Sequence, residues 1–204
     1  MEKKTHWENI YHTKDFAQVS WFKPHLTASL EIILGLAIQK GDPVIDVGGG
    51  ASTLVDDLLE AGFQDITILD ISKKALEVSQ KRLGQQSKKI KWIEGDVTQT
   101  ELPEQHYEIW HDRAVFHFLT NSEDRRRYID ALEYSLKAGG HVIVATFSLK
   151  GPERCSGLEI VRYSPESLQL ELGKRFKLIK SFAESHKTPF GTTQEFMYGH
   201  FQKV

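Results

Sequence analysis

Short apolar runs alternate with amphipathic segments through most of this chain. Five runs are rich in β-branched and aromatic side chains, a pattern that predicts buried strands. They cover residues 43–47, 66–69, 90–93, 107–110 and 141–147. Between them, apolar residues recur at helical spacing in segments that begin near Ser52, at Ser72 and near Glu123. The resulting β-α-β-α-β order predicts a parallel sheet with right-handed crossovers.

The end of the chain departs from this alternation. Extended segments at residues 176–183 and 195–201 are separated by Pro189-Phe190-Gly191, and no helix is predicted between them. This pattern predicts a hairpin. One of its two strands must therefore run antiparallel to the rest of the sheet.

Two helices are predicted before the first strand. The first covers residues 3–13 and places Trp7 and Tyr11 on one side, and the second follows an apolar stripe from Leu26 to Ala37. Together with Trp21, these aromatic side chains either cap the core or close over a ligand, and the pattern favours neither. We expect a single domain over residues 1–204, with a helical lid at 1–38 and the sheet core at 40–204.

Composition supports one α/β domain of ordinary character. The chain has 204 residues, of which 40% are hydrophobic and 26% charged, and its net charge of −2 gives no basic footprint for nucleic acid. A single cysteine allows no internal disulfide and favours a reducing compartment. No apolar run approaches the length of a membrane span, and no signal segment follows Met1. We therefore expect a cytoplasmic protein that binds neither membrane nor nucleic acid; nothing in the pattern indicates its oligomeric state.

The first strand leads into three consecutive glycines, Gly48, Gly49 and Gly50. Without Cβ atoms, the backbone can turn sharply and a ligand can lie against bare peptide. The following helix would present free N–H groups there. The dinucleotide fingerprint G-x-G-x-x-G fails because Thr53 occupies the place of its third glycine. A tight turn with no ligand is the plain alternative.

Asp46, Gly48 and Gly50 instead form D-x-G-x-G, which resembles motif I of class I S-adenosylmethionine (SAM) methyltransferases. Later strand ends extend the resemblance: Asp70 comes 20 residues after Gly50, Asp96-Val97 ends the third strand, and residues 111–119 resemble motif IV and the segment behind it. Residues 136–140, Leu-Lys-Ala-Gly-Gly, are similar to the family's L-K-P-G-G turn and should stop the preceding helix. The resemblance implies a Rossmann-like α/β fold, with helices on both faces of a mostly parallel seven-stranded sheet. Its strand order would be 3-2-1-4-5-7-6, with strand 7 antiparallel.

The resemblance also implies which residues bind SAM and its product S-adenosylhomocysteine. Asp70 would accept hydrogen bonds from the ribose hydroxyls, and Asp96 would accept one from the adenine amine. The backbone of Val97 would contact the adenine ring. The full set implied for the cofactor is Asp46, Gly48, Gly49, Gly50, Asp70, Ile71, Asp96, Val97, His111, Tyr11 and Trp21. The nine histidines show no metal-ligand spacing, so no metal is predicted.

Three residues are candidates for catalysis. The resemblance to motif IV implies that Asp112, Arg113 and His117 would lie nearest the methyl group. His117 is either a general base or a structural histidine within an apolar run. Arg113 either pairs with a substrate carboxylate or offsets Asp112. Cys155, in the loop after the fifth strand, is not expected to act as a nucleophile.

Three functions remain open at this point. The chain resembles a subgroup of small bacterial methyltransferases along nearly its whole length, which favours methyl transfer to a small molecule. Its N-terminal aromatic residues are distantly similar to those of small lysine methyltransferases that act on citrate synthase or an elongation factor, so a protein substrate is the first alternative. The second is a catalytically silent protein that binds SAM or a nucleotide. A dehydrogenase is disfavoured by Thr53 and Asp96.

Overall fold

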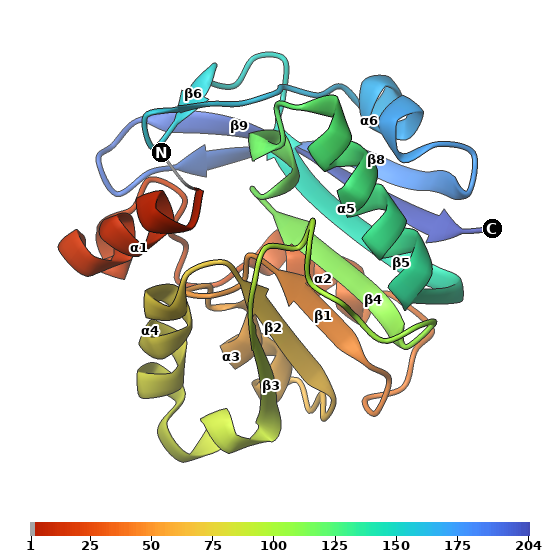
Figure 1. Cartoon of the computed structure of the whole chain (residues 1–204), viewed down its shortest axis with the longest axis horizontal. Coiled ribbons are helices and arrows are strands. Elements are labelled where there is room, and N and C mark those ends of the chain that lie inside the picture. The colour runs from red at the N-terminus through yellow and green to blue at the C-terminus, as the bar shows by residue number, and fades with distance from the viewer. Residues whose placement is uncertain (1–2) are drawn as a thin grey trace.

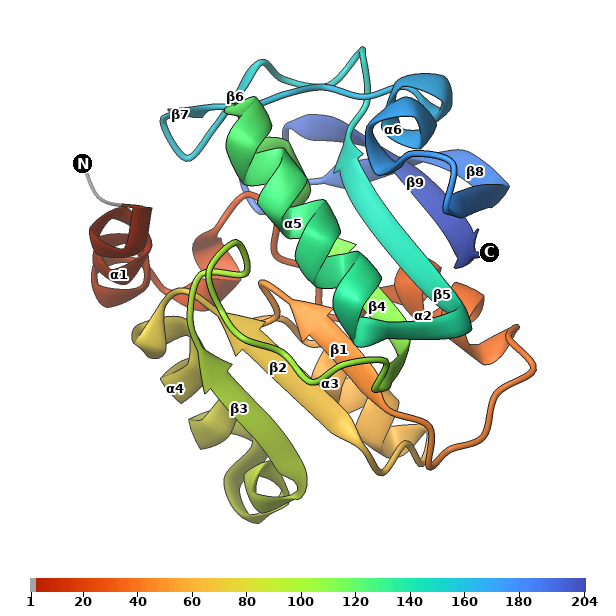
Figure 2. The same ribbon diagram turned by 45° about the vertical axis from the view of Figure 1, so that its right-hand side comes forward.

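The computed structural model describes residues 3–204, and these form three layers. A seven-stranded sheet lies in the middle, with helices on both faces (Figures 1 and 2). The strands are β1 (Val44–Val47), β2 (Ile66–Asp70), β3 (Ile90–Glu94), β4 (Tyr107–Arg113), β5 (Leu136–Phe147), β8 (Phe176–Lys187) and β9 (Thr193–Lys203). The helices are α1 (Lys3–Thr13), α2 (Thr27–Leu34), α3 (Leu54–Glu60), α4 (Lys73–Leu83), α5 (Ser122–Ser135) and α6 (Pro165–Leu172). A small hairpin, β6 (Arg154–Cys155) with β7 (Leu158–Glu159), stands apart from the sheet.

The sheet has the order β3-β2-β1-β4-β5-β9-β8. Strands β1 to β5 pair in parallel, whereas β9 runs antiparallel to both of its neighbours, β5 and β8. Because β8 and β9 are the sixth and seventh strands of the sheet, this is the expected order 3-2-1-4-5-7-6. The hairpin and its antiparallel strand are confirmed.

Side-chain alternation along the strands divides the core into two halves. One half joins Ile45, Trp110 and Val144 to the inner faces of α5 and α6, where Tyr128 and Leu168 are buried. The other half joins further strand residues to α2, α3 and α4. Residues on the same strand therefore face opposite layers, which decides where each functional side chain points.

Several element boundaries differ from the predicted ones. The fourth strand runs three residues further than expected, through Arg113, because polar side chains there are held on the buried sheet. α5 ends at Ser135, so Gly139 and Gly140 lie inside β5 and do not stop the helix. α3 begins at Leu54, close to the predicted start near Ser52.

A further departure is that α6 was not predicted at all. Its local signals are present, since Ser164 and Ser167 form a reciprocal capping box, Pro165 occupies the first turn and Gly173 ends the helix. The signals were missed because the helix has only eight residues and lies between two segments that suggested loop and strand.

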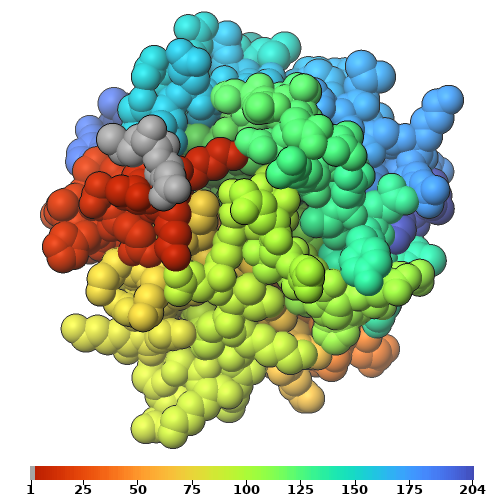
Figure 3. Space-filling model, viewed as in Figure 1, coloured from red at the N-terminus to blue at the C-terminus, as the bar shows by residue number. Residues whose placement is uncertain are grey.

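The N-terminal helix α1 lies outside the sheet layers, beside α4 (Figures 1 and 2). In the space-filling view, the red residues of α1 border the yellow residues of α4 (Figure 3). None of the side chains of α1 is fully buried. The helix therefore covers the edge of the sheet without joining its core.

Candidate functional site

A cleft opens at the carboxyl ends of β1 to β4, where open parallel sheets bind their ligands. It contains about 930 Å³ of space, part of which is continuous with solvent. Its walls come from α1, the loop before α2, four successive strand ends and the β6–β7 hairpin. The lining residues are Lys3, Trp7, Tyr11, Trp21, Val47, Gly48, Leu69, Asp70, Ile71, Gly95, Asp96, Val97, Arg113, Ala114, Val115, Phe118, Leu119, Cys155 and Leu158.

The glycine turn after β1 is shaped by the chain's own side chains. Gly48 has a φ of +72°, and a Cβ there would collide with Val115. A Cβ on Gly49 would collide with Asp46, and one on Gly50 would lie 2.5 Å from Asp70 Oδ2 and Ala75 Cβ. These absent side chains thus make room for neighbouring residues of the protein, a reason that the sequence pattern did not reveal.

Asp70, the last residue of β2, fixes this turn. Its Oδ2 accepts the backbone N–H of Gly50 at 2.9 Å, and its Oδ1 accepts that of Ser72 at 2.8 Å. Burial raises the pKa of Asp70 to about 6, although both hydrogen bonds oppose the shift. Asp70 also lines the cleft, so its carboxylate is available to a ligand near neutral pH.

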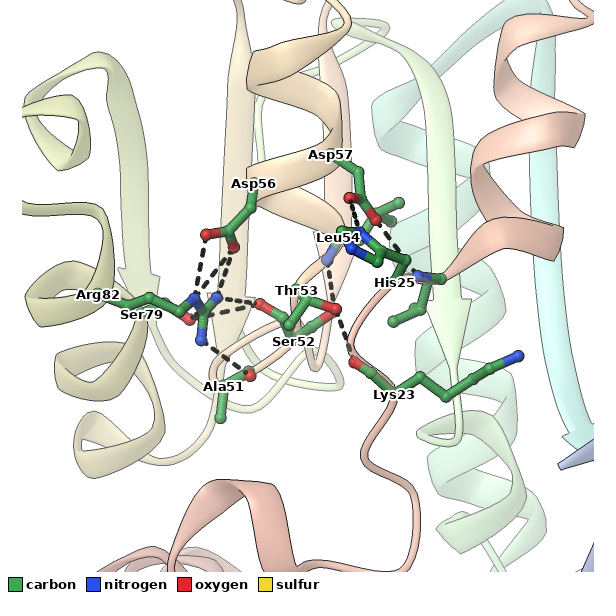
Figure 4. Close-up of polar contacts among 11 residues, drawn as sticks. Lys23, His25, Ala51, Ser52, Thr53, Leu54, Asp56, Asp57, Ser79 and Arg82 are labelled. Atoms are coloured by element: carbon green, nitrogen blue, oxygen red, sulfur yellow. Dashed lines mark hydrogen bonds and ion pairs between the residues drawn. The ribbon is translucent and has the colours of Figure 1, made fainter. Parts of the chain in front are cut away.

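A polar network holds the start of α3 against its surroundings (Figure 4). Arg82 of α4 donates to the carbonyls of Ala51 and Ser52 and forms an ion pair with Asp56. On the other side, Thr53 Oγ1 donates to the carbonyl of Lys23 at 2.9 Å. The segment before α2 is thereby tied to the glycine turn.

At the end of the third strand, Asp96 and Val97 also line the cleft. Asp96 Oδ1 accepts both the backbone N–H and the hydroxyl of Thr98, at 2.9 and 2.8 Å. These bonds orient the carboxylate, and Val97 is buried beside it.

A second, smaller cavity adjoins the first and shares Tyr11, Trp21, Gly48 and Arg113 with it. Asp46 and His111 line this smaller cavity. Their side chains meet at 2.6 Å between Oδ1 and Nδ1, and His111 Nε2 continues to Ser29 Oγ at 2.8 Å. The other carboxylate oxygen, Asp46 Oδ2, is buried with no partner among residues 3–204.

The N-terminal segment closes one side of the cleft with aromatic rings. Trp7 meets Phe118 and Trp21 edge to face, with ring centroids 5.0 and 5.7 Å apart, and Tyr11 lies 6.4 Å from Trp21. Glu8, on the same helix, accepts the backbone N–H groups of Lys73 and Lys74 at the start of α4. Sequence reasoning missed Glu8 because its partners lie 65 residues away.

Arg113, the last residue of β4, also lines the cleft. Its Nη1 donates to the carbonyl of Trp21 at 3.0 Å, and its Nε to the hydroxyl of Tyr198 at 3.2 Å. The guanidinium carbon lies 4.3 Å from the ring centre of Phe196. Its ion pair is with Glu184, at 3.8 Å between Nη2 and Oε2, which argues against the suggestion that Arg113 offsets Asp112.

Asp112 points to the opposite face of the sheet and does not line the cleft. Its carboxylate accepts the N–H groups of Val115 and Phe116 and the hydroxyl of Tyr128. Burial raises its pKa to about 6. Asp112 therefore holds the turn that presents Ala114 and Val115 to the cleft.

His117 likewise does not line the cleft, and it is fully buried. Its Nδ1 accepts the backbone N–H of Phe147 at 3.3 Å, and its ring packs on that of Phe147. Burial lowers its pKa to about 3, so the ring stays neutral and cannot serve as a base with a pKa near neutrality. The geometry supports the structural alternative for His117.

The cleft thus brings together Gly48, Asp70, Ile71, Asp96, Val97, Tyr11, Trp21 and Arg113, whereas Asp46 and His111 face the adjoining cavity. Gly49, Gly50, Asp112 and His117 line neither cavity. Among residues 3–204, no three His, Cys, Asp or Glu side chains group as metal ligands. Within the same range, no helix combines the length and apolar character needed to cross a membrane.

Comparisons with known proteins agree with this geometry. A family model described as a methyltransferase domain matches residues 44–140. The eEF1A lysine and N-terminal methyltransferase of Mus musculus is 24% identical over 119 residues, which cover 58% of this chain but 17% of the relative. A ribosomal RNA small subunit methyltransferase of Arabidopsis thaliana is 36% identical over 73 residues, or 35% of this chain and 21% of the relative. The chain therefore spans about a fifth of the length of these curated relatives.

Solved structures show the same fold along the whole chain. A SAM-dependent methyltransferase of Anabaena variabilis superposes with a TM-score of 0.77 at 14% identity, covering 100% of this chain and 96% of that one. The 1,6-didemethyltoxoflavin-N1-methyltransferase of Burkholderia thailandensis, solved with its substrate and S-adenosylhomocysteine, gives 0.70 at 17% identity and covers 98% and 87%. Residues 44–140 therefore match the model of the methyltransferase domain family, and the chain has the fold of class I SAM-dependent methyltransferases.

Proposed function

We propose that this protein transfers the methyl group of SAM to a small-molecule acceptor. The observation that carries the proposal is the cleft lined by four neighbouring strand ends, with Asp96, Asp70, Gly48 and Arg113 following the strand order β3-β2-β1-β4. Carboxylates occupy one end of this series and a guanidinium the other. Such an order suits a nucleoside at the first end and a reacting group at the second.

The residues present fit the cosubstrate. Asp70 and Asp96 offer carboxylate oxygens to the ribose hydroxyls and the adenine amine, and Val97 offers its backbone to the ring. Asp46 Oδ2, which is buried and has no partner among residues 3–204, fits an ammonium donor, as the methionine portion carries. Trp7, Tyr11 and Trp21 would cover the bound molecule and exclude water.

SAM supplies a sulfonium-activated methyl group, so the protein chiefly needs to align a nucleophile and keep water out. The acceptor's lone pair forms the new bond to carbon while the carbon–sulfur electron pair passes to sulfur. A proton on the acceptor leaves to solvent, because the lining offers no poised base near Arg113. The Cys155 thiol there stays protonated, since burial raises its pKa to about 11.

A small acceptor is favoured because α1 and the β6–β7 hairpin both contribute to the walls of the cleft. The alternative acceptor, a protein lysine, is favoured by the similarity to the eEF1A lysine and N-terminal methyltransferase. A catalytically silent SAM-binding protein remains the third candidate, and a nucleic-acid substrate is not expected from the net charge of −2.

Calorimetric titration with SAM, S-adenosylhomocysteine and NAD tests the cosubstrate. We expect micromolar binding of the first two and none of NAD. Asp70→Ala should weaken binding about 10- to 100-fold, as expected for the loss of charge-assisted hydrogen bonds. Glu104→Gln, on an exposed loop, is the control and should bind normally. Unchanged affinity in folded Asp70→Ala would refute the assignment of the cleft.

A transfer assay tests the acceptor. The protein is incubated with methyl-labelled SAM and a cell extract, which is then separated into protein and small-molecule fractions. We expect label among the small molecules. Label in protein alone would favour the lysine alternative, and label in neither fraction would favour the silent protein.

A further inference from the structure

The far end of the cleft carries a buried positive charge that the protein does not fully neutralise. The side chain of Arg113 is 5% exposed, and an arginine keeps its charge at any physiological pH. Among residues 3–204, its Nη2 atom has no hydrogen-bond partner. Its other nitrogens donate to a carbonyl and a hydroxyl, which are neutral groups. A buried guanidinium in this state favours an incoming anion.

The neighbouring carboxylate of Glu184 forms an ion pair with Arg113 but no hydrogen bond, and its Oε2, like Arg113 Nη2, is buried with no hydrogen-bond partner among residues 3–204. Glu184 Oε1 lies 2.5 Å from Lys23 Nζ, while Glu184 Oε2 is 3.8 Å from Arg113 Nη2, which is too far for a hydrogen bond. Lys23 reaches Glu184 because its backbone carbonyl is held by Thr53 and its side chain extends away from that contact (Figure 4). Two cations therefore share one carboxylate, which leaves one positive charge in excess.

Among the residues that line the cleft, the charged ones besides Arg113 are Lys3, Asp70 and Asp96. Trp21, Phe118, Leu158 and the protonated Cys155 line the end near Arg113, whereas Asp70 and Asp96 lie at the ends of β2 and β3. An ammonium group entering here would meet a like charge in an apolar setting. A carboxylate would meet its complement.

We propose that the methyl acceptor carries a carboxylate or equivalent anionic group, and that Arg113 binds this group through Nη2. The inference rests on the proposed function and narrows it, because it selects anionic small molecules over lysine side chains. Trp21 and Tyr198 hold the guanidinium in place. Arg113 then determines which acceptor is positioned at the methyl group.

The test uses a cell extract that is separated by ion exchange into anionic, neutral and cationic pools before methylation. Each pool is incubated with methyl-labelled SAM and the full-length protein. We expect transfer with the anionic pool. Transfer with only the neutral or cationic pool would overturn this inference and leave the proposed function intact, whereas S-adenosylhomocysteine binding without transfer in any pool would overturn both.

Variants assign the effect to the residue. Arg113→Met should lower the rate at limiting amounts of the anionic pool about 10- to 100-fold, with recovery at high amounts, as expected for lost charge-assisted hydrogen bonds. Arg113→Lys keeps the charge and is expected to show a smaller loss of rate at limiting amounts of the anionic pool. This variant carries the test should Arg113→Met fail to fold. Arg175→Met removes an exposed arginine paired with Glu133 and should match the wild type. An unchanged rate in folded Arg113 variants would refute the inference.

A second binding measurement separates the two possible sources of the carboxylate, because SAM itself carries one. S-adenosylhomocysteine retains the amino-acid portion, and 5′-methylthioadenosine lacks it. If Arg113 binds the acceptor, Arg113→Met and Arg113→Lys bind both compounds as the wild type does. If the variants weaken S-adenosylhomocysteine alone, Arg113 holds the cosubstrate and the inference is wrong.

Discussion

Asp70 and His117 show at the scale of single residues what position along the chain does and does not predict. The place of Asp70 at the end of β2 fixes its backbone beside the glycine turn, so its presence in the cleft was predictable. His117 lies in a short turn after β4. In such a turn, a shift of one residue along the chain decides whether a side chain faces the cleft or the core. The run of apolar neighbours from Val115 to Leu119 was the better guide, since the ring is fully buried.

The protonation of Asp70 should control cosubstrate affinity. Because burial raises its pKa to about 6, the carboxylate is lost as the pH falls through that value, and with it the charged acceptor for the ribose. The carboxylates of Asp46 and Glu8 nearby contribute to the same shift. We expect the dissociation constant of S-adenosylhomocysteine to rise between pH 7 and 5. Asp70→Asn should bind weakly at both pH values, and a persisting pH dependence in that variant would contradict the assignment.

At the scale of elements, α1 is held over the cleft by a capping interaction. The first N–H groups of a helix lack intrahelical partners, and Glu8 of α1 accepts two of them at the start of α4. Ser72 accepts a third, from Ala75. The closed position of α1 therefore depends on a contact between two elements that are far apart in the sequence. This explains why the sequence predicted the helix but not the hydrogen bonds of Glu8 that hold it in place.

Glu8→Gln should loosen this closure. The variant loses a charged cap of the kind that contributes about 0.5–2 kcal/mol, so we expect S-adenosylhomocysteine to dissociate about 2- to 30-fold faster. Stopped-flow fluorescence of Trp7 and Trp21 would follow the release. Glu77→Gln makes the same substitution on α4, at a residue paired with Lys74, and should leave the rate unchanged. Equal rates in all three proteins would show that α1 does not gate the cleft.

For the molecule as a whole, the sheet was predictable and the environment of Arg113 was not. Apolar runs and a hairpin signal are local, and they were enough for the parallel strands and the antiparallel hairpin, whereas the strand order 3-2-1-4-5-7-6 came from the resemblance to class I methyltransferases. Tyr198 and Glu184 come from β9 and β8, 85 and 71 residues after Arg113, and reach it only because the antiparallel hairpin completes the sheet beside β5. The chemistry at this end of the cleft is thus a product of the topology.

Buried histidines with lowered pKa values and buried aspartates with raised pKa values should also set how the stability of the whole molecule responds to pH. The pKa of His117 falls to about 3, so below pH 6.5 the unfolded chain binds a proton there that the folded chain does not, and stability is lost as the pH falls. The lowered pKa values of His186 and His200 act in the same direction.

Asp70 and Asp112 act oppositely, because their pKa values, raised to about 6, let the folded chain take up protons first. Their contribution to stability is present below the ordinary aspartate pKa and is lost as the pH rises through 6. Between pH 7 and 5, the losses from the histidines and the gains from the aspartates therefore partly cancel. A modest decline in the free energy of unfolding is expected for the wild type.

His117→Asn isolates one of these contributions. The asparagine oxygen can still accept the N–H of Phe147, and the side chain no longer titrates. The variant should therefore be less stable than the wild type at pH 7, but the difference in unfolding free energy should shrink by about 2 kcal/mol at pH 5. Urea denaturation at both pH values measures this, with His12→Asn on exposed α1 as the matched control that should track the wild type. If the difference in unfolding free energy between His117→Asn and the wild type is the same at both pH values, the His117 imidazole takes up protons equally in the folded and unfolded chains. The conclusion that its buried ring is neutral, which excludes His117 from catalysis, would then be wrong.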